Sequence, residues 1–471
     1  MAKVQGARSY ELLASLSLAK LYQSTGRPAD AHAVLTPALE GFAPTPEMPE
    51  IAEAKALLGA LAETEEVEAA AARRERRVKI QTAFGQALMW TKGFASQGAK
   101  DAFARAREMS GGRDDAAERF PAYYAQFVRS YMRAEWSQAR GTAEAFLREA
   151  EDRGCATEAC AARRCLGTAC LFQGDLREAQ ALLEQALADY APHRDALARF
   201  RFAFDTGVLA AAHLALAMWR LGEVVRACQL AKQAIQRAAE LGHAPTSAAV
   251  YTLAALLDTE RDDPGAVLRS AEIAHALGLE HGMDPYVAEG GAFAGWARGR
   301  LHDPAVGAQE FRQALADYFN QGNKAVSPLF HGMLAQLEAV TRGPDAALTL
   351  VNEGLAIAAE TEERFTDAYL HRLRGDILLK GDPANPAPAE EAFKTAISVA
   401  KEQGGRSYEL LASLSLAKLY RSNGRRTDAN AVLAPALTGF SPTPEMPEIA
   451  EAQTLLAALA ANEPDTPDPP Q

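Results

Sequence analysis

The chain lacks the sequence features that most enzymes and membrane proteins carry. Its 471 residues contain no G-x-x-x-x-G-K-[ST] phosphate loop, no H-E-x-x-H zinc motif, no G-x-S-x-G nucleophile motif and no dinucleotide glycine fingerprint. They also contain no run of about 18 apolar residues, which a membrane-spanning helix needs. We therefore expect a chain that is not an enzyme, and we assign it no catalytic, cofactor-binding or metal-binding residue.

The acidic balance of the chain narrows the range of its partners. A net charge of −12 and a pI near 5.4 create a field that repels phosphate backbones and anionic lipids, so we expect neither nucleic acid nor a membrane as partner. The apolar segment Leu12–Leu21 looks like a signal peptide, but the same segment recurs at Leu410–Leu419, deep inside the chain. We therefore expect a cytoplasmic protein.

The five cysteines do not suggest a disulfide framework or a metal site. Cys155, Cys160, Cys165 and Cys170 follow one another at steps of five residues. On a helix each such step turns the side chain by about 140°, so successive thiols do not share a face. We expect free, buried thiols in helix packing, as in a reducing compartment.

What the chain does have is a long internal duplication. Residues 2–62 match residues 400–460 at 48 of 61 positions, and RSYELLASLSLAKLY stands at both Arg8–Tyr22 and Arg406–Tyr420. Between the copies runs a rhythm of about 40 residues, in which a Gly-Asp, Gly-Glu or Asp-Pro turn precedes a helix that opens with small residues. Alanine and leucine are abundant throughout and favour helix. The pattern predicts an all-α protein, a right-handed α-solenoid of helical hairpins.

The turns place the hairpins along the chain. We expect hairpins at 9–41, 66–110, 120–153, 158–190, 200–241, 246–278, 286–320, 327–360, 366–403 and 407–440, with further helices at 47–62 and 446–461. Residues 1–62 are expected to be a partial repeat segment and residues 63–461 the solenoid. The proline-rich tail, 462–471, is expected to be disordered.

Two resemblances follow from these segments. A Leu-Gly pair in the first helix, a Gly-Asp turn and an alanine early in the second helix, seen best from Cys165 to Ala186, resemble tetratricopeptide repeats (TPR). Over nearly its whole length the chain also resembles the C-terminal repeat region of large bacterial proteins that join a class III adenylate or guanylate cyclase to a predicted signalling ATPase. The segments that carry this second likeness are VKIQTAFGQALMWTKGFAS at 78–96, 165–192, 203–223, and the ending SYELLASLSLAKLY with GFSPTPEMPEIAEAQTLLAAL.

The second resemblance implies a regulatory or partner-binding arm. In that family the catalytic and nucleotide-binding parts lie N-terminal to the repeats, and no residue here matches them. Three functions remain open. The one we expect is a non-catalytic protein–protein interaction scaffold; the others are a regulatory or sensor arm of a nucleotide cyclase or signalling ATPase, and a small-molecule sensor, which needs a deep apolar pocket between repeats.

Several histidines and tryptophans could be taken for metal-binding, catalytic or ligand-contact residues, but their positions have structural explanations. His275 and His281 lie with Glu280 and Asp284 at a helix end, but a spacing of six puts the two imidazoles on opposite sides of the helix. His213, on an apolar helix, is expected to be buried and hydrogen-bonded. The residues expected in the core are Trp136, Trp219 and Trp296.

A partner protein or peptide is expected on the concave face of the solenoid, which the first helices of the hairpins line. We expect the arginines there to be scattered, solvated charges, and a row of arginines that grips acidic peptide termini is the alternative. The candidates are Arg129, Arg133, Arg163, Arg164, Arg201, Arg298 and Arg372.

The first copy of the duplication lacks a neighbour that the second copy has. Leu18 and Leu21 lie on the side of the first helix opposite to Leu12, so this helix needs cover on both sides. The second copy follows a helix at 389–401, and the first copy has no counterpart of it. We hypothesise that the surface of 389–401 also accepts Arg8–Tyr22 of another molecule, giving an end-to-end homo-oligomer. Alternatively, the start of the sequence lies inside a longer reading frame.

Overall fold

The computed structural model describes residues 8–25, 27–43, 48–61, 116–195 and 198–461, together with scattered helical positions between residues 73 and 105. Within these ranges the regular structure is helical and no β-strand occurs. The chain is therefore all-α, a TPR-like α-solenoid of helical hairpins. It forms two compact units, an N-terminal unit and a larger C-terminal body.

Within residues 8–61, the described part of the N-terminal unit is a hairpin followed by one more helix. Its helices are α1 (Arg8–Ser24), α2 (Pro28–Leu39) and a helix at 50–61. Leu12 and Leu35, from the two hairpin helices, are both fully buried in a core that also takes side chains from the third helix. The hairpin predicted at 9–41 and the helix predicted at 47–62 are confirmed.

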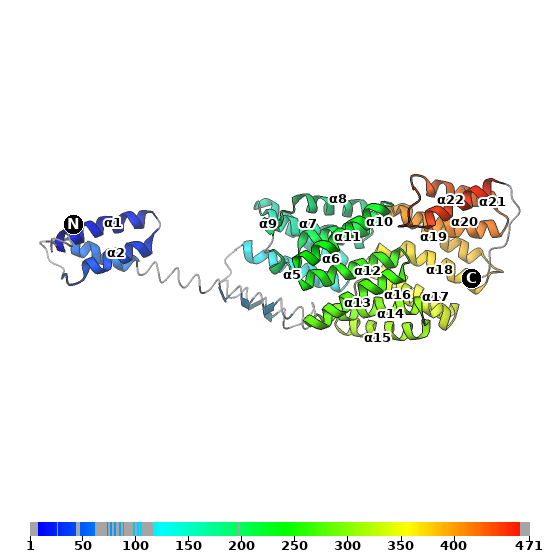
Figure 1. Cartoon of the computed structure of the whole chain (residues 1–471), viewed down its shortest axis with the longest axis horizontal. Coiled ribbons are helices and arrows are strands. Elements are labelled where there is room, and N and C mark those ends of the chain that lie inside the picture. Colours follow the sequence, from blue (N-terminus) through cyan, green and yellow to red (C-terminus); the bar gives the residue numbers. More distant parts are fainter. Residues whose placement is uncertain are drawn as a thin grey trace. The chain divides into compact units, whose positions relative to one another are not determined.

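The C-terminal body consists of eight hairpins and a last helix among its described residues, and Figure 1 shows the paired helices following one another along it. The pairs are α5 (Ala116–Met132) with α6 (Trp136–Asp152), α7 (Ala156–Phe172) with α8 (Leu176–Asp189), α10 (Thr206–Arg220) with α11 (Val224–Leu241), α12 (Ala244–Glu260) with α13 (Pro264–His281), α14 (Asp284–Leu301) with α15 (Pro304–Asn320), α16 (Ser327–Thr341) with α17 (Pro344–Thr361), α18 (Asp367–Gly381) with α19 (Ala387–Gln403), and α20 (Arg406–Ser422) with α21 (Arg426–Leu437). The remaining elements are α9 (Pro192–Asp195), η1 (Ala198–Phe200), η2 (Arg364–Thr366) and α22 (Glu448–Ala460).

These elements confirm the predicted hairpins from 120–153 onward, with one shift. The hairpin predicted to start at residue 200 starts at Thr206, because α9 and η1 occupy the preceding segment and Asp205 caps α10. The Asp205 carboxylate accepts a hydrogen bond from the Val208 N–H at 3.0 Å. Most of the predicted hairpin 66–110, the proposed boundary after residue 62 and the tail 462–471 lie outside the described residues.

The turns between helices follow the local chemistry expected of them. Gly174 and Gly222 end α7 and α10 with φ of +86° and +94°, a left-handed backbone that glycine adopts without a Cβ penalty. Asp303 opens α15 by accepting the Ala305 N–H at 2.8 Å, and Pro304 occupies the first helical turn. Turn and cap residues thus set where each hairpin bends.

First and second helices of the hairpins differ in burial. Almost every side chain of α7 and α10 is buried, so these first helices are covered on all sides. The second helix α8 buries one stripe, Leu176, Ala179, Leu183 and Ala186, and leaves its other face in solvent. The first helices therefore form the inside of the body.

Successive turns of the superhelix contact one another. The Lys324 N–H donates to the Met132 carbonyl at 2.6 Å, where the end of α5 meets the segment before α16. Ser407 donates to the Trp219 carbonyl 188 residues away, and Arg261 pairs with Glu445, 184 residues away, at 3.0 Å. These contacts tie the ends of the first helices α5, α10 and α12 to segments far along the chain.

Close approach between α14 and α15 depends on glycine. A Cβ on Gly307 would lie 2.3 Å from Gly299 Cα and 2.6 Å from the Gly295 carbonyl oxygen. We expect Gly307→Ala to lower the free energy of unfolding by roughly 1–3 kcal/mol, because backbone atoms of α14 cannot move aside. Gly141→Ala in α6 is the control, since no atom lies within 4 Å of its Cβ, and it is expected to stabilise by up to about 1 kcal/mol. Chemical denaturation of both variants measures the difference, and equal stabilities would contradict the close-packing argument.

Candidate functional site

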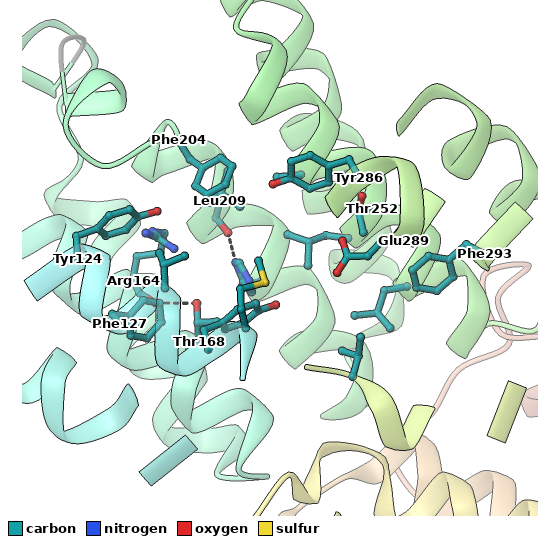
Figure 2. Close-up of a pocket in the computed structure, with 18 residues that line it drawn as sticks. Tyr124, Phe127, Arg164, Thr168, Phe204, Leu209, Thr252, Tyr286, Glu289 and Phe293 are labelled. Atoms are coloured by element: carbon teal, nitrogen blue, oxygen red, sulfur yellow. Dashed lines mark hydrogen bonds between the residues drawn. The ribbon is translucent and has the colours of Figure 1, made fainter. Parts of the chain in front are cut away.

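A cavity lies at the inner face of the C-terminal body, between the first helices of successive hairpins (Figure 2). Side chains of α5, α7, α10, α12 and α14 line it, and Val326 closes it before α16. Its volume, counted as the space open to the centre of a water molecule, is about 90 Å³. On the same measure one water molecule needs roughly 10–15 Å³, so the cavity has room for a small ligand. Most of the wall is apolar. Its aromatic residues are Tyr124, Phe127, Tyr131, Phe204, Tyr286 and Phe293.

Arg164 is the one arginine in the wall of this cavity. It is 4% exposed, and its guanidinium lies 5.5 Å from the centre of the Tyr124 ring. Its NH2 group lies 3.4 Å from Cys165 Sγ, a weak acceptor, and its Nε has no hydrogen-bond partner. A hydrogen bond links its side chain to the Tyr124 hydroxyl, and no carboxylate pairs with it within the part of the chain that the structure describes. A buried cation without a counter-ion costs several kcal/mol, so Arg164 is held at a marked energetic cost.

The groups around Arg164 are neutral and do not compensate its charge. Burial, with the nearby Arg164 cation, lowers the pKa of His213 to about 3, and its Nδ1 lies 2.7 Å from the Leu209 carbonyl. Burial raises the pKa of the Cys165 thiol to about 11. His213 is thus a buried, hydrogen-bonded histidine, as predicted, and the positive charge at this end of the cavity belongs to Arg164 alone.

Glu289 lies in the cavity wall on α14, away from Arg164 in the view of Figure 2. Burial raises the pKa of its carboxyl to about 7, against the opposing effect of a hydrogen bond with Tyr318. Near neutral pH this carboxyl is therefore divided between its charged and uncharged forms. The cavity combines an apolar body with a cation at one end and a titrating acid at the other.

The structure does not gather the seven candidate arginines into a row. Arg163 donates to Asp189 and Glu151, pointing away from its neighbour Arg164. Arg201 pairs with Glu158 at 2.6 Å and is part of no cluster with the others. Four more sites are separate: Arg133 pairs with Glu135, Arg298 with Glu272 and Glu310, Arg372 with Asp376, and Arg129 is half-buried on α5. Most of the seven lie in ion pairs on the solenoid's own surface, which agrees with the expected scattered charges and gives no support to a row.

The other residues singled out in the sequence are structural. Trp136, Trp219 and Trp296 are at most 1% exposed, which confirms their place in the core. All five cysteines are free, and Cys155 alone is not fully buried. His275 Nδ1 lies 2.9 Å from the Val287 carbonyl. Among the residues that can be placed, no group of three His, Cys, Asp or Glu side chains could hold a metal ion, and no helix is long and apolar enough to cross a membrane.

A second candidate site lies on the N-terminal unit and emerges from the duplication. The two copies fold alike: Lys20 pairs with Glu53 at 2.6 Å in the first copy, and Lys418 pairs with Glu451 at 2.6 Å in the second. In both copies the first helix packs on the second through the same apolar side, which includes Leu12 and its counterpart Leu410. The internal packing of the module therefore does not depend on where it stands in the chain.

The opposite sides of the two first helices differ sharply in exposure. On α1, Leu13, Leu18 and Leu21 are 37%, 36% and 57% exposed, and we call these three residues the α1 face. Their counterparts on α20 are Leu411, Leu416 and Leu419, exposed by 9%, 2% and 3%. Helices α10, α18 and α19 provide the cover on α20. The same side chains are thus interior in one copy and exposed in the other.

Comparisons with known proteins return likenesses of shape alone. No model of a protein family matches the chain, and no curated protein matches it. The apo form of RapI covers 80% of this chain and 98% of its own, at 12% identity and a TM-score of 0.38. The match to yeast Tom70 covers 95% of this chain and 95% of Tom70, at 12% identity and a TM-score of 0.34. The match to a Rap protein in complex with competence and sporulation factor covers 96% of this chain and 99% of the Rap protein, at 13% identity and a TM-score of 0.32. At such scores the function of this chain must be argued from its own residues.

Proposed function

We propose that the chain is a non-catalytic protein–protein interaction scaffold whose α1 face binds a helical surface of a partner protein. The observation that carries the proposal is that the identical segments Arg8–Tyr22 and Arg406–Tyr420 have different surroundings. Leu18 is 36% exposed, whereas Leu416, at the equivalent position of the second copy, is 2% exposed. Burying a leucine contributes roughly 1.5–3 kcal/mol, so an uncovered face of three leucines favours association.

The cover on α20 indicates the chemistry of the partner. There, α18 and α19 pack against the leucine side of α20, and the edge of the Trp219 ring from α10 meets Tyr408 at 5.5 Å between centroids. A partner for the α1 face therefore presents a helical hairpin with apolar side chains, in the manner of α18 and α19, whose buried residues include Leu373, Ile377 and Ile397. The charged neighbours Lys20 and Arg27 stay in solvent beside it, paired with acids of their own unit.

A second copy of the chain is a weaker candidate for the partner. The surface of α19 that would accept Arg8–Tyr22 is already covered by α20 of the same molecule. Tethering gives that internal copy an effective concentration in the millimolar range, so another molecule displaces it only by exchange at high concentration. An end-to-end homo-oligomer is therefore expected to be minor beside binding of a different protein.

A pair of matched leucine substitutions tests the proposal. We expect Leu18→Glu to change the free energy of unfolding by less than about 1 kcal/mol, because 36% of this residue is already exposed. Leu416→Glu, at the equivalent buried position, is expected to cost roughly 3 kcal/mol or more, because it buries an unpaired carboxylate. Denaturant unfolding of the two variants measures the contrast.

Binding itself is tested by a photo-reactive side chain placed at residue 18 in the source cells. We expect a crosslink to a second protein that is lost on Leu13→Glu, and no intermolecular crosslink from the same probe at residue 416. If residue 18 crosslinks only to other copies of this chain, the partner is a second copy of the chain and the proposed binding of a different protein is wrong. No crosslink to any protein would refute the scaffold.

The resemblance of segments 78–96, 165–192 and 203–223 to cyclase–ATPase proteins favours a second candidate, a regulatory arm for such an enzyme. This arm would act on its catalytic partner through the same α1 face. Reading the codons upstream of Met1 on the mapped transcript tests it. An in-frame or co-transcribed cyclase or ATPase would support the arm, and an independent transcript without either would count against it.

A further inference from the structure

We propose that the inner cavity of the C-terminal body is a binding site for a small molecule with a carboxylate and an apolar body, and that Arg164 receives the carboxylate. This site is separate from the α1 face and does not depend on the protein-binding function. The acceptors beside the Arg164 guanidinium are the neutral Tyr124 hydroxyl and Cys165 thiol, so neither cancels its positive charge.

The position of Arg164 supports an anionic ligand. The side chain is 4% exposed, its Nε has no partner, and it lies in the cavity wall beside Tyr124. A guanidinium binds a carboxylate through two parallel N–H donors, and in an apolar surrounding this interaction is strong. The Thr168 hydroxyl donates a hydrogen bond to the Arg164 carbonyl at 2.9 Å, within the helix turn that carries the arginine.

The rest of the cavity favours one negative charge on a hydrocarbon frame over a phosphate. Only one cation lines the wall, whereas a phosphate dianion calls for several cationic or N–H donors. Leu209, Leu253, Leu256 and Phe293 supply an apolar surface for the body of the ligand. Glu289 stands at the far side, where it disfavours a second anion and suits a hydroxyl or amine.

Free carboxylic acids and the carboxyl-terminal residue of a peptide share this chemistry. Thermal unfolding of the full chain with hexanoate, hexanol and hexylamine tests the charge, and a short peptide ending in a free or an amidated leucine tests the source. We expect a rise in the melting temperature with hexanoate or with the free-carboxylate peptide, and none with hexanol or the amidated peptide. Whichever acid raises it identifies the source.

Two cavity variants decide whether Arg164 is responsible. Arg164→Met is expected to raise the melting temperature of the ligand-free protein, because an unpaired buried charge is removed, and to abolish the response to the acid. Glu289→Gln changes the opposite wall and is expected to keep that response. Leu18→Glu, on the N-terminal unit, is expected to keep it too. An Arg164→Met protein that responds as the wild type does, or a wild type that responds to no carboxylate, would overturn the proposal.

Discussion

Replacing Glu260 by leucine is expected to lower the free energy of unfolding by roughly 3–5 kcal/mol. Glu260 accepts from Arg220 Nε at 3.0 Å, and both side chains are 1% exposed. The Arg220 guanidinium lies 3.3 Å from the centre of the Phe365 ring and donates to the Phe365 carbonyl, so it cannot turn to water. The substitution leaves a cation buried without its counter-ion, and denaturant unfolding measures the loss.

The double variant Arg220→Leu/Glu260→Leu provides the control. Apolar side chains in both places remove the uncompensated charge, so the double variant is expected to be no less stable than Glu260→Leu alone, although it removes more polar contacts. A double variant that loses the sum of the two single losses would show that the pair is not coupled. It would also show that desolvation does not dominate at this junction of α10, α12 and η2.

Stability is expected to fall as the pH rises from about 5 to 8, and Glu363 is expected to make the largest single contribution to the fall. Burial raises the pKa of its carboxyl from the ordinary value of 4.5 to about 8. Between these values the folded protein holds a proton that the unfolded chain has released, so raising the pH favours unfolding. The full effect is on the order of 4 kcal/mol, and burial raises the pKa of Glu289 to about 7, which acts in the same direction.

Glu363→Gln separates this charge from the hydrogen bonds that the side chain makes. Glu363 Oε2 accepts from Trp136 Nε1 at 3.1 Å and from the Val326 N–H at 3.2 Å, and an amide oxygen can accept both. We expect the variant to show a flatter pH profile than the wild type and to be more stable above pH 8. Denaturation across the pH range checks this, and parallel profiles for the two proteins would contradict the assignment.

The positions of the hairpins were predictable because local chemistry sets them. Gly174 and Asp303 specify turns and helix starts from a few neighbouring residues, and the structure places helices on either side of each. The burial of His213 was predictable in the same way. An imidazole on a wholly apolar helix is buried, and it needs a hydrogen-bond partner, which here is the Leu209 carbonyl.

The inner cavity was not predictable, since it depends on how far each hairpin rotates relative to the last. Arg163 and Arg164 are adjacent in sequence, yet the first lies in surface ion pairs and the second lines the cavity. A helix turns by about 100° per residue, so the pattern places them on different faces without saying which face meets a void. Glu363 escaped notice for a similar reason, because its Oε2 accepts from Trp136, which lies 227 residues away in the sequence.

The exposure of the α1 face could not be predicted from its own residues, because the same residues are buried on α20. Leucines on both sides of Arg8–Tyr22 indicated a helix covered on both sides, and this is true of α20 but not of α1 among the described residues. Identical residues predict identical folding of the module, while its surroundings are set by what stands next to it in the chain.

The contacts between successive superhelical turns change how the C-terminal body should come apart. In an open repeat array each hairpin touches only its neighbours, so unfolding proceeds inward from a frayed end. Here Ser407, in the last hairpin, donates a hydrogen bond to the Trp219 carbonyl, and Glu445, after that hairpin, accepts one from Arg261. The end of the array is therefore linked to its middle. Pulling on the C-terminus should therefore meet a single large mechanical barrier in place of a series of small, evenly spaced ones.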